Sequence, residues 1–595
     1  MLRDMILYFC AVLLLLPLSH ALPSFGSELC RYLPGDTYWP TEAEWSKLNT
    51  TVGGRLIKTI PLGSPCHGSS YRAAECEYLQ AEWTNPELQY AQLHPYCCYS
   101  SWSKFDPLRS ADSPSSFGAP FFQAQACDPF TNKSSPCELG NYYVYAINVT
   151  GAADVAVGLA FAQDHNIRLV IKNTGHEQVS LCVGTLRVRR SSGKGALGLW
   201  THNLRAISIL DYKSSLYTGK AMKVGSGVQV FHAYSAAHKA GLRVVGGTCS
   251  TIGMAGGYTQ GGGHSMLSTA YGLAADQVLE WEAVLADGTH LTATPTENAD
   301  LYWALSGGGG GTYAVVLSMT IKAYADSPVA GAMLQIKETS SSDNFWESVE
   351  AIHAAMPTWI DMGASTAYVL SNGVLSLQML FTTRSAGEVK SILQPLVEKL
   401  DSLSAEYMLN ITAFGDYHTA FNNYFGAYPN SQVQGNRLIP RSGLTSNTSI
   451  AALTLALREI VSNPSFYILG VGIDVSTGAF VPNAVFPGWR NAIASLEVIA
   501  NWDYNVSYAE NAEHQRLITD VYIPSLTAVT GPESGAYMNE ADFQQPDFQS
   551  QFFGENYAAL RAIKGKYDPQ GVFYGNALVG SEEWVVGGDG RLCLV

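Results

Sequence analysis

Three segments rich in glycine or turn residues are the places where this chain could hold a large ligand. They are Asn173–Glu177, Gly246–His264 and Gly307–Gly311, and each follows an expected strand. The backbone can approach a ligand closely where side chains are missing, and consecutive N–H groups can bind a diphosphate. The pattern is compatible with a cofactor threaded through several loops, and equally with simple tight turns.

Several common catalytic signatures do not fit these segments. Thr312 follows the five glycines, so the Gly-x-Gly-x-x-Gly dinucleotide motif is not formed. There is no Gly-x4-Gly-Lys-Ser/Thr phosphate loop, and His176-Glu177 is not followed by a second histidine at the zinc-protease spacing. Gly263–Leu267 breaks the serine-hydrolase elbow at its last position. Nucleotide hydrolysis, zinc proteolysis and lipase-type chemistry therefore lose their usual support, and we predict no metal site.

The elements that must position these segments alternate between strands and short helices up to Tyr324. Beyond it, strands and longer helices alternate with a more ordinary composition, which indicates a second, α+β domain. An Asp287-Gly288 turn between two apolar runs predicts a hairpin. The expected strands are Val144–Val149, Arg168–Lys172, Leu242–Val245, Leu279–Ala286, His290–Ala293, Tyr313–Lys322, Leu375–Phe381 and Phe466–Asp474, and the expected helices are Thr150–Gln163, Val228–Lys239, Ala386–Leu400 and Tyr557–Lys566.

Composition limits the kinds of partner. The chain has 595 residues, which predicts two to four domains, and a formal net charge of −15 with no cluster of Lys or Arg. A nucleic-acid binder would show a basic surface or stripe, so we expect no nucleic-acid partner. No stretch of about 18 apolar residues follows the N-terminus, so we expect no membrane span. The 47% of hydrophobic residues are enough to build a large core.

The N-terminus predicts secretion. Arg3 precedes an apolar run from Met5 to Leu16, and small residues precede a cleavage point after Ala21. Of 11 cysteines, Cys10 leaves with this signal and six lie between Cys66 and Cys137, as in a stapled region of an oxidising compartment. Six Asn-x-Ser/Thr sites favour glycosylation. They are Asn49, Asn132, Asn148, Asn410, Asn447 and Asn505.

Several short motifs, each weak alone, are highly specific when taken together. They are Lys172-Asn173-Thr174-Gly175-His176, Gly247–Gly253, Gly256–Gly263, Gly272–Asp276, Asp300–Leu305 running into the glycines, Asn556-Tyr557, and Ile563–Pro569 with Phe573. The region Leu139–Tyr324 resembles the FAD-binding domain of the vanillyl-alcohol-oxidase type, also called the PCMH type. Within it the chain is most similar to the berberine-bridge-enzyme-like FAD-linked oxidases, and among these to secreted isoamyl-alcohol-oxidase-like members.

The resemblance implies the architecture. It gives an α+β protein with a PCMH-type FAD-binding domain in two α/β subdomains and an α+β substrate domain with an antiparallel sheet. The segments expected are a signal peptide at 1–21, a disulfide-rich N-terminal region at 22–138, the FAD-binding domain at 139–325, the substrate domain at 326–531, and a C-terminal berberine-bridge-like element at 532–595 that returns to the FAD domain.

The resemblance also implies FAD held by two covalent bonds. His176 matches the histidine attached to the flavin 8α-methyl group, and Cys249 matches the cysteine attached to ring carbon C6. Imidazole and thiolate are good nucleophiles, and the oxidised flavin ring is electron-poor. The cofactor-binding residues expected are Lys172, Asn173, Thr174, Gly175, His176, Glu177, Cys249, Thr251, Ile252, Gly253, Gly256, Gly257, Tyr258, Gly262, Gly263, His264 and Asp276.

The number of cysteines affects the prediction that Cys249 is bonded to the flavin. Ten mature cysteines could form five disulfides, so Cys249 could instead be paired. If Cys249 binds the flavin, one cysteine is left over, and Cys182 stands alone in the sequence. The cluster of six could then form three disulfides, and Cys30 could pair with Cys593. We favour the flavin bond because the glycine-rich setting of Cys249 matches the family.

The expected reaction is hydride transfer from an alcohol, sugar or secondary-metabolite carbon to the flavin, with oxygen reduced to hydrogen peroxide. A base must take the substrate proton. We nominate Tyr537, Asn539 and Tyr258, with Glu540 and His264 behind them. One residue more than in plant members lies before Gly256-Gly257, where the family controls oxygen access. We expect Ala255 rather than Met254 to face the ring. A dehydrogenase with another acceptor and a non-catalytic secreted glycoprotein are the alternatives, and we expect a monomer.

Overall fold

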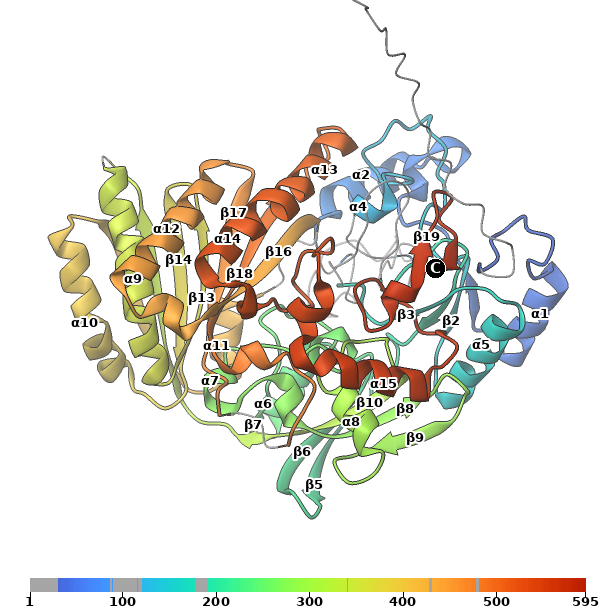
Figure 1. Cartoon of the computed structure of the whole chain (residues 1–595), viewed down its shortest axis with the longest axis horizontal. Helices are drawn as coiled ribbons and strands as arrows, with labels where there is room; N and C mark the ends of the chain where they lie inside the picture. Colours follow the sequence, from blue (N-terminus) through green and yellow to red (C-terminus); the bar gives the residue numbers. More distant parts are fainter. Residues whose placement is uncertain are drawn as a thin grey trace, which may run out of the picture.

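The computed structural model describes residues 30–85, 88, 115, 120–176, 190–339, 341–426, 431–477 and 481–595. The expected signal peptide, Glu177, Cys97, Cys98 and Cys182 lie outside the described residues. The chain is mixed helix and sheet with several antiparallel sheets, as the expected fold class requires (Figure 1). None of the helices among the described residues is both long and apolar enough to span a bilayer.

A first small sheet carries the motif that ends at His176. Its order is β1-β2-β4-β3, and its last three strands are parallel. α5 (Ala152–Asp164) is the crossover between β2 and β3 and packs on the sheet beside α1 (Glu42–Thr51). The sequence predicts that Thr150 caps this helix, but the N-cap is Gly151, and Thr150 donates its N–H and hydroxyl to Asp154. The strands are β1 Leu56–Lys58, β2 Tyr145–Asn148, β3 Leu169–Lys172 and β4 Leu197–Trp200.

A second sheet carries the segments around Cys249 and the five glycines. It has five antiparallel strands in the order β5-β6-β10-β8-β9, and the predicted Asp287-Gly288 hairpin joins the last two. The second glycine segment follows α6 (Val230–Lys239) and β7 (Leu242–Arg243). The third follows the helix α8 (Ala299–Leu305), so the prediction that a strand precedes it is wrong. The strands are β5 Ile207–Lys213, β6 Thr218–Gly225, β8 Val278–Val284, β9 His290–Ala293 and β10 Val315–Lys322.

A third, seven-stranded sheet forms most of the other half of the molecule, on the left in Figure 1. All neighbouring strands are antiparallel, in the order β15-β12-β14-β13-β17-β18-β16. The strands are β12 Val329–Lys337, β13 Ala364–Ser371, β14 Val374–Phe381, β15 Glu406–Phe414, β16 Gln432–Pro440, β17 Phe466–Gly472 and β18 Ala492–Asn501.

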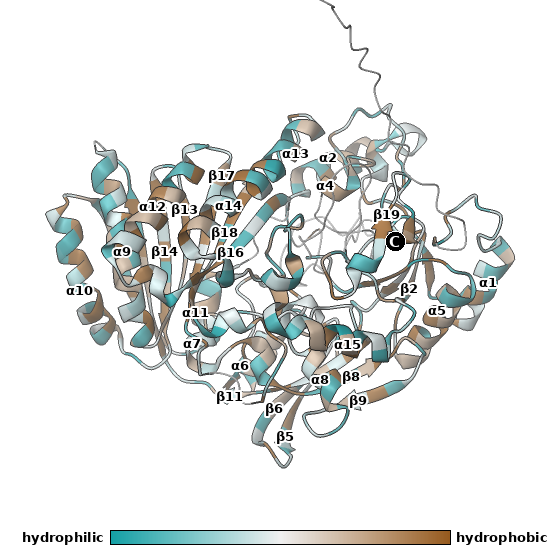
Figure 2. Cartoon of the chain, viewed as in Figure 1, coloured by the Kyte–Doolittle hydropathy of each residue, from teal (hydrophilic) through white to brown (hydrophobic). Residues whose placement is uncertain are grey.

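Four helices cover one face of this sheet and bury its largest apolar core. They are α9 (Ser342–Asp361), α10 (Ala386–Ser402), α12 (Asn447–Ser462) and α14 (Ile523–Thr530). The helices carry both polar and apolar residues, while the strands behind them are mainly apolar (Figure 2). The covered face takes alternate strand residues such as Tyr368, Ile468 and Val498. The intervening residues point to the opposite face, toward the rest of the molecule.

The C-terminal segment packs against the half of the molecule that contains the two smaller sheets. α15 (Tyr557–Tyr567) packs beside α8, across the lower part of Figure 1. Lys564 is buried and its Nζ contacts Asp568 at 2.5 Å, the Phe573 carbonyl at 2.7 Å and the Thr312 carbonyl at 2.8 Å. A buried amine is stable only when its donors are satisfied. This motif therefore fixes the tail directly behind the five glycines.

Three disulfides lie within the described residues. Cys30–Cys593 joins the two ends of the described chain, and Cys66–Cys76 and Cys127–Cys137 staple the N-terminal region. The predicted pairing of Cys30 with Cys593 is confirmed. Cys249 is not disulfide-bonded, so the alternative that it forms a disulfide is wrong for this structure.

Candidate active site

A cavity of about 210 Å³ lies between the glycine segments and the uncovered face of the seven-stranded sheet. The sheet contributes Val369, Leu469, Glu497 and Ile499, which have alternate positions along β13, β17 and β18. Val369 pairs with Leu469, and Leu469 pairs with Glu497. Because side chains alternate across a strand, these residues form one row on one face. With Gln432 and Tyr467, which also line the cavity, the sheet supplies a mixed apolar and polar wall with a single carboxyl group.

Both residues nominated as flavin anchors line this cavity, and both contact the hydroxyl group of Thr251. His176 Nε2 lies 2.7 Å from Thr251 Oγ1, and Cys249 Sγ lies 3.6 Å from the same oxygen. Gly175, with φ of +95°, lets the chain turn into His176 directly after β3. Two residues 73 positions apart in sequence are thereby held by Thr251 on one side of the cavity. Their types and proximity fit a ligand that both could bind covalently.

A smaller cavity of about 40 Å³ shares Asn173, Arg190 and Gly257 with the larger one. Its walls include Gly256, Gly310 and Gly311, where no side chain occupies space. Two buried acceptors that line it, Asn173 Oδ1 and Gln260 Oε1, have no hydrogen-bond partner among the described residues. Buried acceptors of this kind are rare unless a ligand or water supplies the donor. The residues present fit FAD, whose ring and adenine offer N–H donors.

The segment between Cys249 and the larger glycine run has irregular helical geometry. Met254–Tyr258 forms one π-turn in which Gly256 has non-helical backbone angles. Such single π-turns occur frequently at functional sites. Met254 and Ala255 are both fully buried in the same apolar cluster, and Ala255 also lines the smaller cavity. Of the two residues weighed for oxygen access, Ala255 is the one on a cavity wall.

The five glycines do not all serve the same purpose. Gly310 and Gly311 line the smaller cavity. A Cβ at Gly307 would overlap the backbone of Ala484 and Val485, and the Ala484 N–H donates to the Ser306 carbonyl. Gly307 therefore makes room for a loop of the other half of the molecule. The sequence pattern suggests cofactor contact for the whole run, but the structure uses part of it for packing.

A polar cluster from the tail, Tyr537, Asn539 and Glu540, lines the same cavity as the anchors. Asn539 Nδ2 donates to Tyr537 Oη at 2.7 Å and to the Gly257 carbonyl at 2.9 Å. Gly263 gives the Tyr537 hydroxyl a backbone hydrogen bond, and burial raises the pKa of Tyr537 well above its usual value. Tyr537 is therefore a neutral phenol at neutral pH. Tyr258 lines the cavity, but its hydroxyl donates to the His264 carbonyl at 2.8 Å.

Two glutamates complete this cluster. Glu540 Oε1 lies 2.8 Å from Nε2 of buried His264. Glu497 is hydrogen-bonded to Glu540, and burial followed by the charge of Glu540 raises the pKa of Glu497 well above its usual range. Two carboxyl groups in contact cannot both ionise cheaply, so they share a proton. Glu497 therefore favours its protonated form, and Glu540 lines the same cavity between Glu497 and His264.

Sequence reasoning missed Glu497. It is the single charged residue within the apolar strand Ala492–Asn501, and it is 7% exposed. An ionisable residue inside a buried strand is a signal of a functional site. Gln432 and Tyr467, which line the same cavity from β16 and β17, carry no comparable signal.

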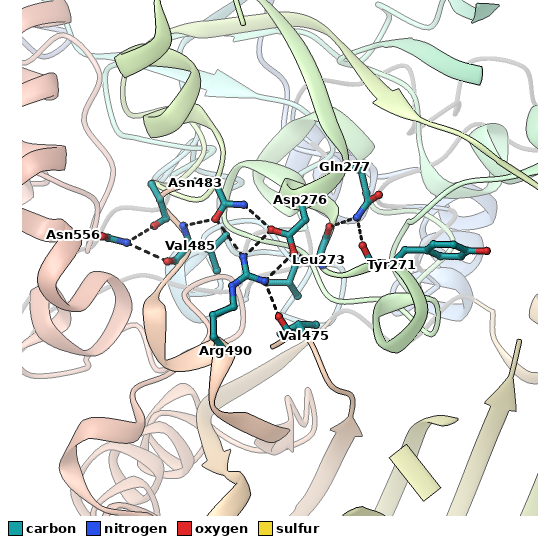
Figure 3. Close-up of polar contacts among 10 residues, drawn as sticks. Tyr271, Leu273, Asp276, Gln277, Val475, Asn483, Val485, Arg490 and Asn556 are labelled. Carbon is teal, nitrogen blue, oxygen red and sulfur yellow. Dashed lines mark hydrogen bonds and ion pairs between the residues drawn. The ribbon is translucent and has the colours of Figure 1, made fainter. Parts of the chain in front are cut away.

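Asp276, nominated as a cofactor residue, lies in a different environment (Figure 3). Its fully buried carboxylate receives two hydrogen bonds from Arg490, at 2.7 and 2.9 Å, and one from Asn483 at 2.6 Å. The Leu273 N–H also donates to it at 2.8 Å. These contacts give Asp276 a role in joining the two halves of the chain, and it lines neither of the two cavities.

Some of the other nominated residues line the larger cavity, and the rest lie next to residues that line it. The larger cavity is lined by Asn173, Thr174, Ile252, Gly253, Gly257 and His264 as well as the anchors. Gly262 and Gly263 form a turn with positive φ angles next to Tyr537. Lys172 is buried at the end of β3, with its Nζ 3.4 Å from the Thr174 carbonyl. Their roles toward a cofactor stay predictions, and Glu177 lies outside the described residues.

Comparison with known families agrees with this geometry. A family model described as "FAD binding domain" matches residues 145–294, and one described as "Berberine and berberine like" matches residues 536–577. The chain is 42% identical over 575 residues to the FAD-linked oxidoreductase sor8 of Hypocrea jecorina, covering 96% of this chain and 94% of that protein. It is 41% identical over 578 residues to the VAO-type flavoprotein oxidase VAO615 of Thermothelomyces thermophilus, covering 95% and 96%.

Solved structures show the same fold. The VAO-type flavoprotein MtVAO615 from Myceliophthora thermophila C1 superposes with a TM-score of 0.87 at 40% identity, covering 95% of this chain and all of that chain. Glucooligosaccharide oxidase from Acremonium strictum, described with a 6-S-cysteinyl, 8α-N1-histidyl FAD, has a TM-score of 0.57 at 19% identity, covering 74% and 92%.

Fold, cavity and similarity together define a FAD-dependent oxidoreductase. The chain belongs to the family of VAO-type FAD-linked oxidoreductases with a berberine-bridge-like C-terminal element. Its members act on small molecules, and the alternative of a non-catalytic glycoprotein is discarded.

Proposed function

We propose that this protein is a secreted, monomeric oxidase that takes hydride from a carbon bearing a hydroxyl group in an alcohol, sugar or secondary metabolite. The carrying observation is that His176, Cys249 and the carboxyl group of Glu540 line one cavity. Anchors for a flavin and an acceptor for the substrate proton are thus in one place. When bound, the flavin supplies a two-electron acceptor that oxygen can reoxidise, giving hydrogen peroxide.

The protein's own part in the reaction is proton transfer and positioning. The substrate hydroxyl loses its proton to the Glu540 carboxylate, which His264 orients through its 2.8 Å hydrogen bond. Glu497 keeps the proton it already holds. The neutral phenol of Tyr537, fixed by Asn539, can donate to the substrate oxygen but is a poor base. The apolar side chains of Val369, Leu469 and Ile499 exclude water from the reacting carbon.

The proposal of secretion rests on the sequence. It is supported by the solvent exposure of the asparagines in the glycosylation motifs. Four of the six acceptor asparagines, Asn132, Asn410, Asn447 and Asn505, are exposed. Mass spectrometry of the protein from culture medium should find glycans on some of these four and a mature chain that begins at Leu22. A single peak at the chain's size in analytical ultracentrifugation should report a monomer.

Covalent attachment tests the assignment of the cavity. After acid denaturation the yellow colour should stay with the precipitated protein, and peptide mapping should place flavin on both His176 and Cys249. The His176→Ala variant should keep the flavin through Cys249 but turn over more slowly, because one electron-withdrawing link is lost. Free FAD in the supernatant of wild-type protein would exclude both bonds.

The electron acceptor is tested at Ala255. Reduced flavin reacts with oxygen only where space beside the ring admits it, and Ala255 is a small residue on a cavity wall. We expect Ala255→Leu to slow reoxidation by air-saturated buffer at least tenfold in stopped-flow mixing, with an unchanged rate of flavin reduction by substrate. If wild-type reoxidation by oxygen is much slower than turnover with an artificial acceptor, the enzyme is a dehydrogenase instead.

A further inference from the structure

A second cluster of chemically capable side chains lies outside the cavity, where α6 meets α11 (Tyr417–Tyr424). It consists of His238 in the last turn of α6, Asp416 at the start of α11, and His418 in the first turn of α11. One ligand atom from each residue lies within 4.8 Å of those of the other two. The two imidazole rings are nearly parallel with centroids 4.8 Å apart, and His238 Nδ1 is 3.4 Å from Asp416 Oδ1.

The helices hold this cluster in place. Asp416 is the N-cap of α11: its Oδ1 accepts from the Thr419 N–H at 2.7 Å and its Oδ2 from the Thr419 hydroxyl at 2.8 Å. Each carboxylate oxygen keeps a further lone pair. Beneath the cluster, Tyr234 of α6 packs edge-on against Tyr417 and Phe421 of α11. The carboxylate is therefore held in place, while His238 is exposed and His418 is partly exposed.

We propose that His238, Asp416 and His418 form a binding site for a divalent transition metal ion, of which Zn²⁺ is the test case. Two imidazoles and one carboxylate are a donor set for zinc, copper or nickel and not for calcium or magnesium, which take oxygen ligands. Zinc–nitrogen and zinc–oxygen bonds of about 2.0–2.2 Å require the ligand atoms to close by roughly 1 Å. The open side of the site leaves a position for water and a path for entry.

Metal bound here would join the two halves of the protein next to a flavin anchor. α6 belongs to the half of the molecule that contains the two smaller sheets, and α11 belongs to the half with the seven-stranded sheet. Both approach Ser250, the neighbour of Cys249: the Phe231 N–H at the start of α6 donates to the Ser250 carbonyl at 3.0 Å, and the Ser250 N–H donates to the Gly426 carbonyl, beyond α11, at 3.3 Å. A metal at the far end of this helix pair would therefore stabilise the interface without touching the cavity.

The test is zinc titration of the untagged holoenzyme after chelator treatment, by calorimetry and by thermal unfolding. We expect one Zn²⁺ per chain with micromolar or tighter affinity, and a rise in melting temperature on binding. His238→Gln and His418→Gln should each weaken binding at least tenfold and abolish the rise. His290→Gln is the matched control, because His290 is an exposed histidine that contacts one carboxylate, Glu282, at 3.1 Å. It should bind zinc like wild type.

Two further readings make the result decisive. The ratio of flavin to protein absorbance and the metal-free melting temperature should match wild type in all three variants, which shows that they fold. Adding Co²⁺ should give visible d–d absorption beyond the flavin bands in wild type and not in the double variant. If wild type takes up no zinc, or if the His238→Gln/His418→Gln double variant binds zinc as tightly as wild type, the site does not exist.

Discussion

At the scale of single residues, the paired glutamates decide how the site handles protons. Glu497 is held on a rigid strand against Glu540, and the raised pKa of Glu497 means that it carries the shared proton. Glu540, hydrogen-bonded to His264, is the base in the proposed reaction. A general base contributes roughly 10²- to 10⁴-fold to a rate. We expect Glu540→Gln to slow flavin reduction by substrate at least about 100-fold, measured by anaerobic stopped flow.

The matched variant Glu497→Gln should keep most of this activity, because it imitates the protonated acid. Its effect should appear in stability. A carboxyl whose folded-state pKa is raised stabilises the fold at low pH, and this contribution is lost as pH rises toward the folded pKa. The melting temperature of Glu497→Gln relative to wild type should therefore increase between pH 5 and pH 8. An equal difference at both pH values, or equal loss of activity in both variants, would refute the shared proton.

At the scale of elements, the sequence pattern predicted the positions of most strands and helices, but it did not predict the role of every residue in them. The Asp287-Gly288 hairpin, α10 and α15 lie where periodicity and turn chemistry predict them, because those signals are local. Gly307 shows the limit: its need for glycine comes from a loop almost 180 residues further along the chain. Glu497 shows it too, since its partner Glu540 is supplied by the tail. Long-range contacts leave no local trace.

Gly307 gives a prediction about this docked loop. A methyl group there would overlap Ala484 and Val485 and would also require φ near +121°. We expect Gly307→Ala to lower the free energy of unfolding by at least about 3 kcal/mol, combining backbone strain with overpacking. Gly241→Ala is the control, because Gly241 has φ of +67° with open space around it. It should lose only about 1–2 kcal/mol of strain. Equal losses in chemical denaturation would mean that the loop does not press on Gly307.

At the scale of the whole molecule, the two halves are joined by an ion pair in which the carboxylate is buried and the guanidinium is partly exposed. Arg490 is the partner of the fully buried Asp276 (Figure 3). Removing one member of such a pair leaves the other charge buried without a partner, which lowers the free energy of unfolding by about 3–5 kcal/mol. Arg490→Met should show this loss in urea unfolding. Arg441→Met, which breaks two partly exposed pairs with Asp361 and Asp474, should cost about 1 kcal/mol or less. Similar losses would show that the buried pair does not hold the halves together.

The Cys30–Cys593 bridge makes the described protein a covalent ring of more than 560 residues. A ring must be cut twice before it comes apart. A protease that cleaves one peptide bond anywhere between these cysteines leaves a single molecule, whose two pieces separate in electrophoresis only after reduction. The proposed flavin anchors and proton acceptor come from distant parts of the chain, so a first cleavage between the two cysteines cannot release any of them. If the protein is secreted as proposed, this closure keeps the pieces of a singly cleaved chain together.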